Sequence, residues 1–167
     1  MWLLILIKVY MTSSQKSECP NGNNFVNLGS TCYWFSSDVA AEKRSWPDAR
    51  KRCQELGTHI SMKVDLAEIG YSYLSDQLLL YTIGDKGDWV WLGASDAESE
   101  NVWKWVTSGR SLSLRDSLWW DTQPNSEGEN SGNCLVGFNP TPTRINIRTY
   151  IGDWQCEKQL AFVCQIF

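Results

Sequence analysis

The chain has 167 residues, which is enough for one ordinary domain and too few for two. Hydrophobic residues make up 43% and charged residues 20%, a globular balance that excludes a disordered or collagen-like chain. The net charge of -4 and an isoelectric point near 5.0 leave no basic footprint, so we expect no nucleic-acid partner. Ten tryptophans and six cysteines do not suit an average cytosolic enzyme.

A short apolar run occupies residues 2–7 and is followed by Lys8. It is too short to cross a bilayer, which takes about 20 residues, and no other segment is long and apolar enough, so we expect no membrane span. We interpret residues 1–17 as a signal peptide, cleaved after Ser14 or Ser17, and the protein as secreted. A buried first strand is the alternative, because Lys8 interrupts the run and no basic residue precedes it.

The cysteines are even in number, and none forms the C-x-x-C pair that thiolate zinc sites prefer. In a secreted chain the economical interpretation is three disulfides, although the count alone does not choose among the connectivities. The six are Cys19, Cys32, Cys53, Cys134, Cys156 and Cys164.

The first elements in chain order are two short strands, predicted over residues 24–28 and 32–35 between turn residues. A helix is expected to begin after Ser45, with Pro47 in its first turn, and to end at Gly57. These signals predict a hairpin followed by a helix.

A second helix is expected to open at Asp65, because Glu68 follows three residues later in a capping-box pattern. Its apolar side would comprise Leu66, Ile69, Tyr73, Leu74 and Leu78.

The second half of the chain predicts strands at 89–93 and 102–106, rich in aromatic and branched residues. A long irregular region lies between and after these strands, roughly from Ser95 to Cys134. Irregular regions of this length inside a compact domain usually have a function. Strands at 134–138 and 160–165 close the chain. The pattern predicts one α+β domain.

Four motifs, taken in order, resemble those of C-type lectin domains over residues 19–165. They cover the family's core strand, its next strand, the tryptophan before the sugar-binding triplet and the closing signature. In this chain they read Trp91-Leu92-Gly93-Ala94, Trp103-Lys104-Trp105 with Gly109, Trp119 five residues before Pro124, and Asp153-Trp154-Gln155-Cys156 with Phe162-Val163-Cys164.

The resemblance implies a C-type lectin-like fold with two helices, two small antiparallel sheets, a long ligand-binding loop and three disulfides. In the long form of this domain the bonds would be Cys19–Cys32, Cys53–Cys164 and Cys134–Cys156. Most tryptophans need no functional role. We expect Trp34, Trp46, Trp91, Trp103, Trp105 and Trp119 in the core and Trp120 and Trp154 near the surface.

The resemblance also implies a calcium ion in the long loop that receives two sugar hydroxyls, held by hard oxygen ligands. Gln123-Pro124-Asn125 stands where the family has Glu-Pro-Asn or Gln-Pro-Asp, with a cis proline between the two side chains. Asp153 matches the family's last aspartate. The implied sugar- and calcium-binding residues are Gln123, Asn125, Glu129 and Asp153.

The chain departs from the family pattern at two of these positions. Gly152 replaces an asparagine, and Gly132 stands where the family has a glutamate. Glu129, or else Glu127, lies slightly upstream and is the candidate replacement; a solvated loop acid is the alternative. Fewer ligand charges predict weak calcium binding.

Two further acids, Asp96 and Glu100, match ligands of an auxiliary calcium site found in some members. Ser126 and Asn133 occupy its other positions and lack carboxylates, so we expect a weak or absent second ion. Solvated loop acids are the favoured alternative.

The function that follows is a secreted lectin that recognises glycans through calcium, with microbial glycans in innate immunity as the expected targets by family analogy. No aromatic residue lies between Pro124 and Cys134, which favours mannose-type or broad recognition over galactose. A homo-oligomer would supply avidity. The alternative is a calcium-independent domain that binds a protein or another non-sugar surface.

No catalytic pattern is present: the chain has no P-loop, dinucleotide fingerprint or Ser/Cys–His motif. Its single histidine, His59, is interpreted as a structural or surface residue. We expect no enzymatic activity.

Overall fold

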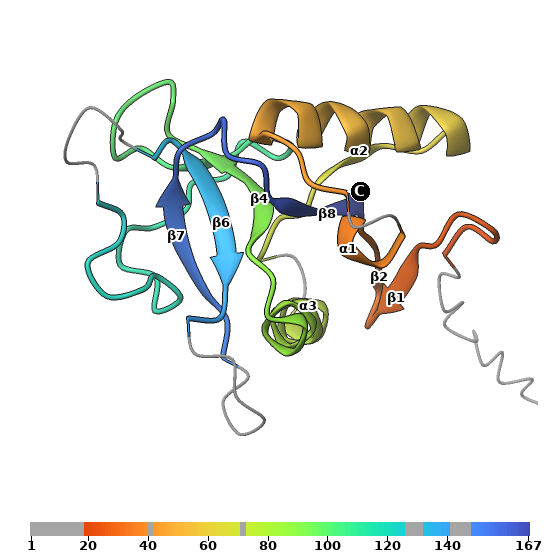
Figure 1. Ribbon diagram of the computed structural model, residues 1–167, viewed down its shortest axis with the longest axis horizontal. Coiled ribbons are helices and arrows are strands. Elements are labelled where there is room, and N and C mark those ends of the chain that lie inside the picture. Colours follow the sequence, from red (N-terminus) through yellow and green to blue (C-terminus); the bar gives the residue numbers. More distant parts are fainter. Residues whose placement is uncertain (1–18, 40–41, 71–72, 126–131, 141–147) are drawn as a thin grey trace, which may run out of the picture.

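The computed structural model describes residues 19–39, 42–70, 73–125, 132–140 and 148–167 (Figure 1). The expected signal peptide lies outside these ranges. The helices are α1 (Ser36–Val39), α2 (Trp46–Ile60) and α3 (Tyr73–Lys86). The strands are β1 (Val26–Leu28), β2 (Thr31–Phe35), β3 (Val64–Leu66), β4 (Val90–Ser95), β5 (Lys104–Trp105), β6 (Cys134–Phe138), β7 (Tyr150–Trp154) and β8 (Ala161–Ile166).

The strands pair in the order β1-β2-β8-β4-β6-β7, with β3 added to β8 and β5 to β4. All of these pairings are antiparallel except that of β4 with β8, which is parallel. Two antiparallel groups are therefore joined by one parallel contact at the centre. In Figure 1 α2 lies along the top of the strands, and α3 lies below them. This α+β architecture confirms the predicted fold class.

The start of α2 agrees with the sequence and its end does not. The Ser45 hydroxyl accepts a hydrogen bond from the Asp48 N–H at 3.4 Å and caps the helix, as predicted. The helix then continues past Gly57 to Ile60 and ends at Ser61, whose φ of 56° is left-handed. A Cβ on Gly57 would lie 2.6 Å from the Met62 carbonyl oxygen. Glycine is needed at this position for close packing, so it does not stop the helix.

The prediction of a helix opening at Asp65 is wrong. Asp65 belongs to β3, and α3 begins only at Tyr73. The Asp65 carboxylate accepts from Arg50 Nε at 3.1 Å, and Glu68 is fully buried. The two acids that resemble a capping box serve contacts with distant segments instead.

The expected apolar side of that helix is also wrong at its centre. Tyr73 is 82% exposed and Leu74 60% exposed, whereas Leu66 is buried in β3. The buried side of α3 is formed by Ser75, Asp76, Leu79, Leu80, Ile83 and Gly84.

All three disulfides implied by the resemblance are present, joining Cys19 to Cys32, Cys53 to Cys164 and Cys134 to Cys156. The six tryptophans expected in the core are at most 9% exposed, and Trp120 and Trp154 are 36% and 37% exposed. These predictions are confirmed. The buried residues form two contiguous clusters on the two sides of the strands.

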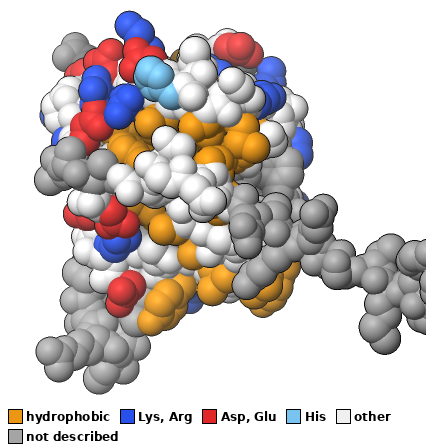
Figure 2. All heavy atoms as spheres, turned by 90° about the vertical axis from the view of Figure 1, so that its right-hand side faces the viewer, with side chains coloured by type: hydrophobic (Ala, Val, Ile, Leu, Met, Phe, Trp, Pro, Cys, Tyr) orange, Lys and Arg blue, Asp and Glu red, His pale blue; other side chains and the backbone are white. Residues whose placement is uncertain are grey.

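Figure 2 shows the face at the right of Figure 1, where acidic and basic side chains are interspersed around apolar ones. His59, in the last turn of α2, is exposed. None of the helices in the described ranges is both long and apolar enough to span a membrane.

Candidate functional site

The candidate site lies where the long loop returns to the outer edge of β7. The Trp120 N–H donates to the Ile151 carbonyl at 2.9 Å, and the Ile151 N–H donates to the Leu118 carbonyl at 2.8 Å. These bonds fix the loop along β7, at the left of Figure 1. They bring Gln123 beside the strand that carries Asp153.

Three of the predicted site residues are joined by hydrogen bonds. The Asp153 N–H donates to Gln123 Oε1 at 3.0 Å, and the Asn125 N–H donates to Asp153 Oδ1 at 2.8 Å. The bond between Gln123 and Pro124 is cis, as the resemblance implies. The structure therefore places Gln123, Asn125 and Asp153 together, in agreement with the sequence.

Asp153 is a buried acid, and the residue is only 3% exposed. Burial raises its pKa; hydrogen bonds from backbone N–H groups, including those of Asn125 and Gly132, oppose the rise, and the charge of Glu100 adds to it. No cation in the described part of the chain forms an ion pair with Asp153. A bound cation would favour the ionised form of this group.

A second buried carboxylate, Asp96, lies nearby and is 4% exposed. Its Oδ2 accepts from the Asn101 N–H at 2.9 Å, whereas its buried Oδ1 has no hydrogen-bond partner among the described residues. Burial raises the pKa of Asp96, and the charges of Glu100 and Asp153 raise it further. Asp96, Glu100 and Asp153 are therefore close enough for their charges to interact.

The side-chain oxygen of Asn133 is likewise buried and has no partner in the described ranges. Ser95 pairs with Cys134 across the antiparallel β4–β6 contact, and the Ser95 hydroxyl donates to the Asn133 carbonyl at 2.6 Å. This register sets Asp96 beside Asn133. Two buried oxygens with unused lone pairs thus belong to neighbouring positions, as a site for a hard cation requires.

The two glycines that depart from the family pattern differ in how much room they leave. A Cβ at Gly132 would lie 2.4 Å from the Trp154 nitrogen and 2.7 Å from Asp153 Oδ2. A Cβ at Gly152 would lie 3.1 Å from the Phe138 ring and 3.4 Å from Gln123 Oε1. Any side chain at Gly132 therefore requires a backbone shift, whereas at Gly152 only the Phe138 side chain would have to move slightly.

These donors fit a calcium ion only in part. They are all oxygens, which suits calcium, but calcium takes about six to eight ligands. The described residues contain no group of three or more His, Cys, Asp or Glu side chains arranged to hold a metal. Glu127 and Glu129 lie outside the described residues, so the role of Glu129 stays a prediction.

Two pockets meet at Asp153 and Trp154. One, of about 220 Å³, is lined by Asn125 and Gly132 in addition to Asp153 and Trp154. The other, of about 340 Å³, we call the aromatic pocket; its lining includes Trp89, Trp120, Phe138, Trp154, Gln123 and Gly152.

Neither Trp89 nor Phe138 was predicted as a site residue. Trp89 immediately precedes β4 and lies two residues before Trp91, yet Trp91 is fully buried and Trp89 is 36% exposed. Residues two apart in a strand share one face, so sequence alternation provides no signal that would separate Trp89 from Trp91.

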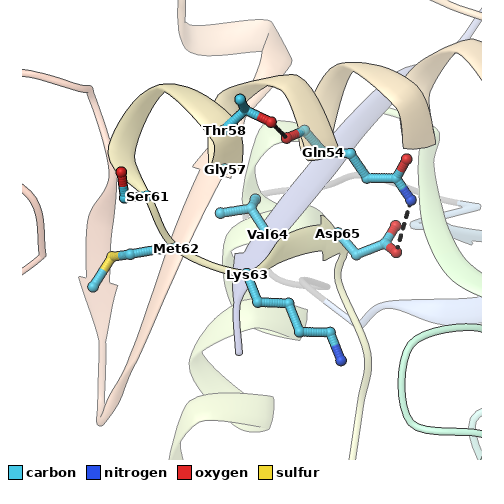
Figure 3. Close-up of a pocket in the computed structure, with 8 residues that line it drawn as sticks. All are labelled: Gln54, Gly57, Thr58, Ser61, Met62, Lys63, Val64 and Asp65. Atoms are coloured by element: carbon cyan, nitrogen blue, oxygen red, sulfur yellow. Dashed lines mark hydrogen bonds between the residues drawn. The ribbon is translucent and has the colours of Figure 1, made fainter.

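A separate pocket of about 340 Å³ lies at the carboxyl end of α2 (Figure 3). Three of its polar residues are joined by hydrogen bonds: Gln54 Nε2 donates to Asp65 Oδ2 at 3.3 Å, and the Thr58 hydroxyl donates to the Gln54 carbonyl at 3.1 Å. It contains no aromatic side chain and lies apart from the predicted site residues.

A family profile described as the Lectin C-type domain matches residues 42–166. The chain belongs to the C-type lectin domain family. Members of this family are non-enzymatic, which confirms the expectation that the chain is not an enzyme.

The relatives found by sequence are distant. C-type lectin domain family 4 member M of Nomascus concolor is 26% identical over 145 residues, covering 86% of this chain and 32% of that protein. The perlucin-like protein of Mytilus galloprovincialis is 30% identical over 109 residues, covering 65% of this chain and 62% of that protein. The chain thus spans less than two thirds of either relative.

Among solved structures, the human scavenger receptor C-type lectin carbohydrate-recognition domain superposes with a TM-score of 0.66 at 24% identity. The match covers 89% of this chain and 98% of that domain. At this identity the likeness establishes the fold.

Proposed function

We propose that this domain binds glycans at the surface formed by Gln123, Asn125 and Asp153, together with a calcium ion. The observation that carries the proposal is the pair of hydrogen bonds through which Asp153 accepts from Asn125 and donates to Gln123. They hold the Gln123 side chain, the Asp153 carboxylate and the Asn125 backbone at one edge before any ligand arrives. Such preorganisation lowers the entropic cost of binding a flexible sugar.

The chemistry of these side chains suits neighbouring sugar hydroxyls. The amides of Gln123 and Asn125 each offer a carbonyl acceptor and an NH₂ donor, so each can serve a hydroxyl in either role. A calcium ion would supply the electrostatic attraction for the hydroxyl oxygens. Asp153 would balance its charge, because it is an ionisable group in an otherwise uncharged set.

The neutral amide pair bears on specificity. The Asp153 N–H orients the Gln123 amide by donating to its Oε1, but both triplet side chains are neutral amides with a donor and an acceptor each, so the pair does not select a single orientation of a hydroxyl pair. We therefore propose mannose-type or broad recognition. Secretion, a homo-oligomer that supplies avidity and microbial glycans as targets belong to the same proposal, supported by family membership.

The direct test is a calcium titration of the disulfide-intact domain, followed by melting temperature. An ion that binds only the folded state raises the melting temperature with occupancy. We expect a saturable rise that Asp153→Asn abolishes and that Glu55→Gln, an exposed acid on α2, leaves unchanged. Binding of methyl α-mannoside should then require calcium.

Calcium-independent binding of a protein is the second candidate. The observation in its favour is the closeness of Gly132 to the backbone of Trp154, which leaves no room for the glutamate of the family pattern. A calcium titration without any response, together with absent binding to a glycan array, would favour this function over the first.

A further inference from the structure

The aromatic pocket adjoins the proposed sugar site and shares Gln123 and Asp153 with it, whereas its aromatic rings take no part in holding calcium. We propose that it is a second subsite, which binds the apolar face of a pyranose ring next to the sugar held at Gln123 and Asp153. This inference rests on the proposed glycan-binding function and names the extended ligand of the same site.

The walls of the pocket are rings that hold one another in place. Trp89 stacks on Phe138 with centroids 4.3 Å apart, and the edge of Trp154 meets Trp89 at 5.1 Å. On the other side Trp120 meets Tyr150 at 4.7 Å. Because stacked and edge-to-face pairs fix ring orientation, the surface is preformed for a flat ligand.

The rings are nevertheless open to solvent. Trp89 and Trp120 are each 36% exposed, and Trp154 is 37% exposed, although all three surround a single cavity of about 340 Å³. Aromatic side chains around a concave space of this size, with a few convergent polar groups, are typical of small-ligand sites. The exposed indole faces are therefore candidate contact surfaces.

The three exposed tryptophans differ from several core tryptophans in the hydrogen bonding of their indole N–H groups. The N–H groups of Trp46, Trp91 and Trp119 each donate to a backbone carbonyl, at 2.8, 2.8 and 2.9 Å. Within the described ranges, no acceptor is found for the indole N–H groups of the three exposed rings. They are available to a ligand that carries oxygen acceptors.

The glycine at position 152 opens the cavity. Side chains alternate along β7, so Tyr150, Gly152 and Trp154 share one face. A Cβ at Gly152 would approach Phe138 to 3.1 Å, inside the aromatic pocket. The residue that removes one calcium-type ligand thus also creates the space between the rings.

The pocket combines aromatic rings with hydrogen-bonding groups, and this combination favours a pyranose as its ligand. Its rings would pack against the C–H groups of a pyranose, which are attracted to the electron-rich aromatic face. Its rim carries Thr122 and Gln123, and its indoles offer donors to the ring hydroxyls. A purely apolar side chain of a partner protein would leave these donors unsatisfied.

The test uses intrinsic tryptophan fluorescence and calorimetry on the whole domain, in calcium, with two sugar probes. Methyl α-mannoside occupies one subsite, whereas mannotriose reaches both. We expect Trp120→Ala to weaken mannotriose binding about tenfold, on the scale of one lost aromatic contact, and to leave methyl α-mannoside unchanged. Trp120→Phe should recover part of the loss, and Gly152→Ala should reproduce part of it by narrowing the space beside Phe138.

A matched control is Tyr73→Ala, which removes an aromatic ring that is 82% exposed on α3. Equal affinity of both sugars for Trp120→Ala and for the unchanged domain would overturn the subsite and leave the proposed function standing. Absence of binding to either sugar would overturn both. Saturable quenching by N-acetyl-tyrosine amide but not by mannotriose would assign the pocket to a protein side chain and overturn the inference.

Discussion

Two buried acidic regions of this domain have opposite environments. Glu68 is fully buried, and its carboxylate accepts from the N–H groups of Thr107 and Ser108 at 2.9 and 3.0 Å and from the Ser108 hydroxyl at 2.7 Å. Arg110 lies 3.4 Å away and adds a positive charge. Asp96, also buried, has one oxygen with no partner among the described residues.

This difference in hydrogen-bond partners indicates that the Glu68 carboxylate stabilises the fold. Glu68 joins the segment after β3 to the turn after β5, and the protein itself supplies the partners of this carboxylate. Asp96 and Asp153 accept hydrogen bonds from backbone N–H groups, but among the described residues neither forms an ion pair with a cation. Buried charge that the protein does not neutralise is destabilising by itself, and it is tolerated where a ligand completes it.

The largest expected effect comes from breaking the satisfied region. Glu68→Ala should destabilise the domain by about 3 kcal/mol or more, because it leaves the N–H groups of Thr107 and Ser108 without their acceptor and removes the carboxylate that pairs with Arg110. Urea denaturation measures the change. Glu55→Gln serves as control and should stay within about 0.5 kcal/mol, as expected for an exposed surface position. A loss below that level for Glu68→Ala would show that the network is not structural.

A smaller effect is expected where the family glutamate is restored in the candidate site. Gly132→Glu should destabilise the domain by about 2 kcal/mol, because its Cβ overlaps the Trp154 nitrogen and the backbone must shift. Gly152→Asn, whose side chain would face the cavity, should destabilise the domain less than Gly132→Glu. Thermal melts of both variants without calcium test this order. A more stable Gly132→Glu domain would mean that the loop accommodates a ligand carboxylate after all.

The smallest effect concerns Asp96 without calcium. Its pKa is raised above 3.8 in the folded state, so its ionised form opposes folding at neutral pH. Asp96→Asn should therefore raise stability by about 1 kcal/mol, roughly 2–4 °C in melting temperature.

The sign of this effect depends on pH and on the ion. As the pH falls through the raised pKa of Asp96, the wild-type group becomes protonated and the advantage of Asp96→Asn should disappear. Saturating calcium should reverse the order at neutral pH, because only the carboxylate neutralises the ion. Melting curves across pH, with calcium or with a chelator, measure both trends. An unchanged order in calcium would remove Asp96 from the ion site.

Several structural features of this protein were determined by its local sequence. The cap at Ser45, the strand of residues 134–138 and the burial of the six core tryptophans follow from residue types and short spacings, which act between near neighbours. The ordered motifs also carried the disulfide pairing and the placement of Gln123 beside Asp153.

Tertiary structure decided the rest. Glu68 imitates a helix-capping residue, yet its partner Ser108 lies 40 positions away in the sequence, so no local pattern could reveal the contact. The unused oxygens of Asp96 and Asn133 arise from the pairing of β4 with β6, and the aromatic pocket gathers rings from distant segments of the chain. Local propensities specify where elements form, whereas the pairing of distant strands determines which polar atoms and aromatic rings are left for a ligand.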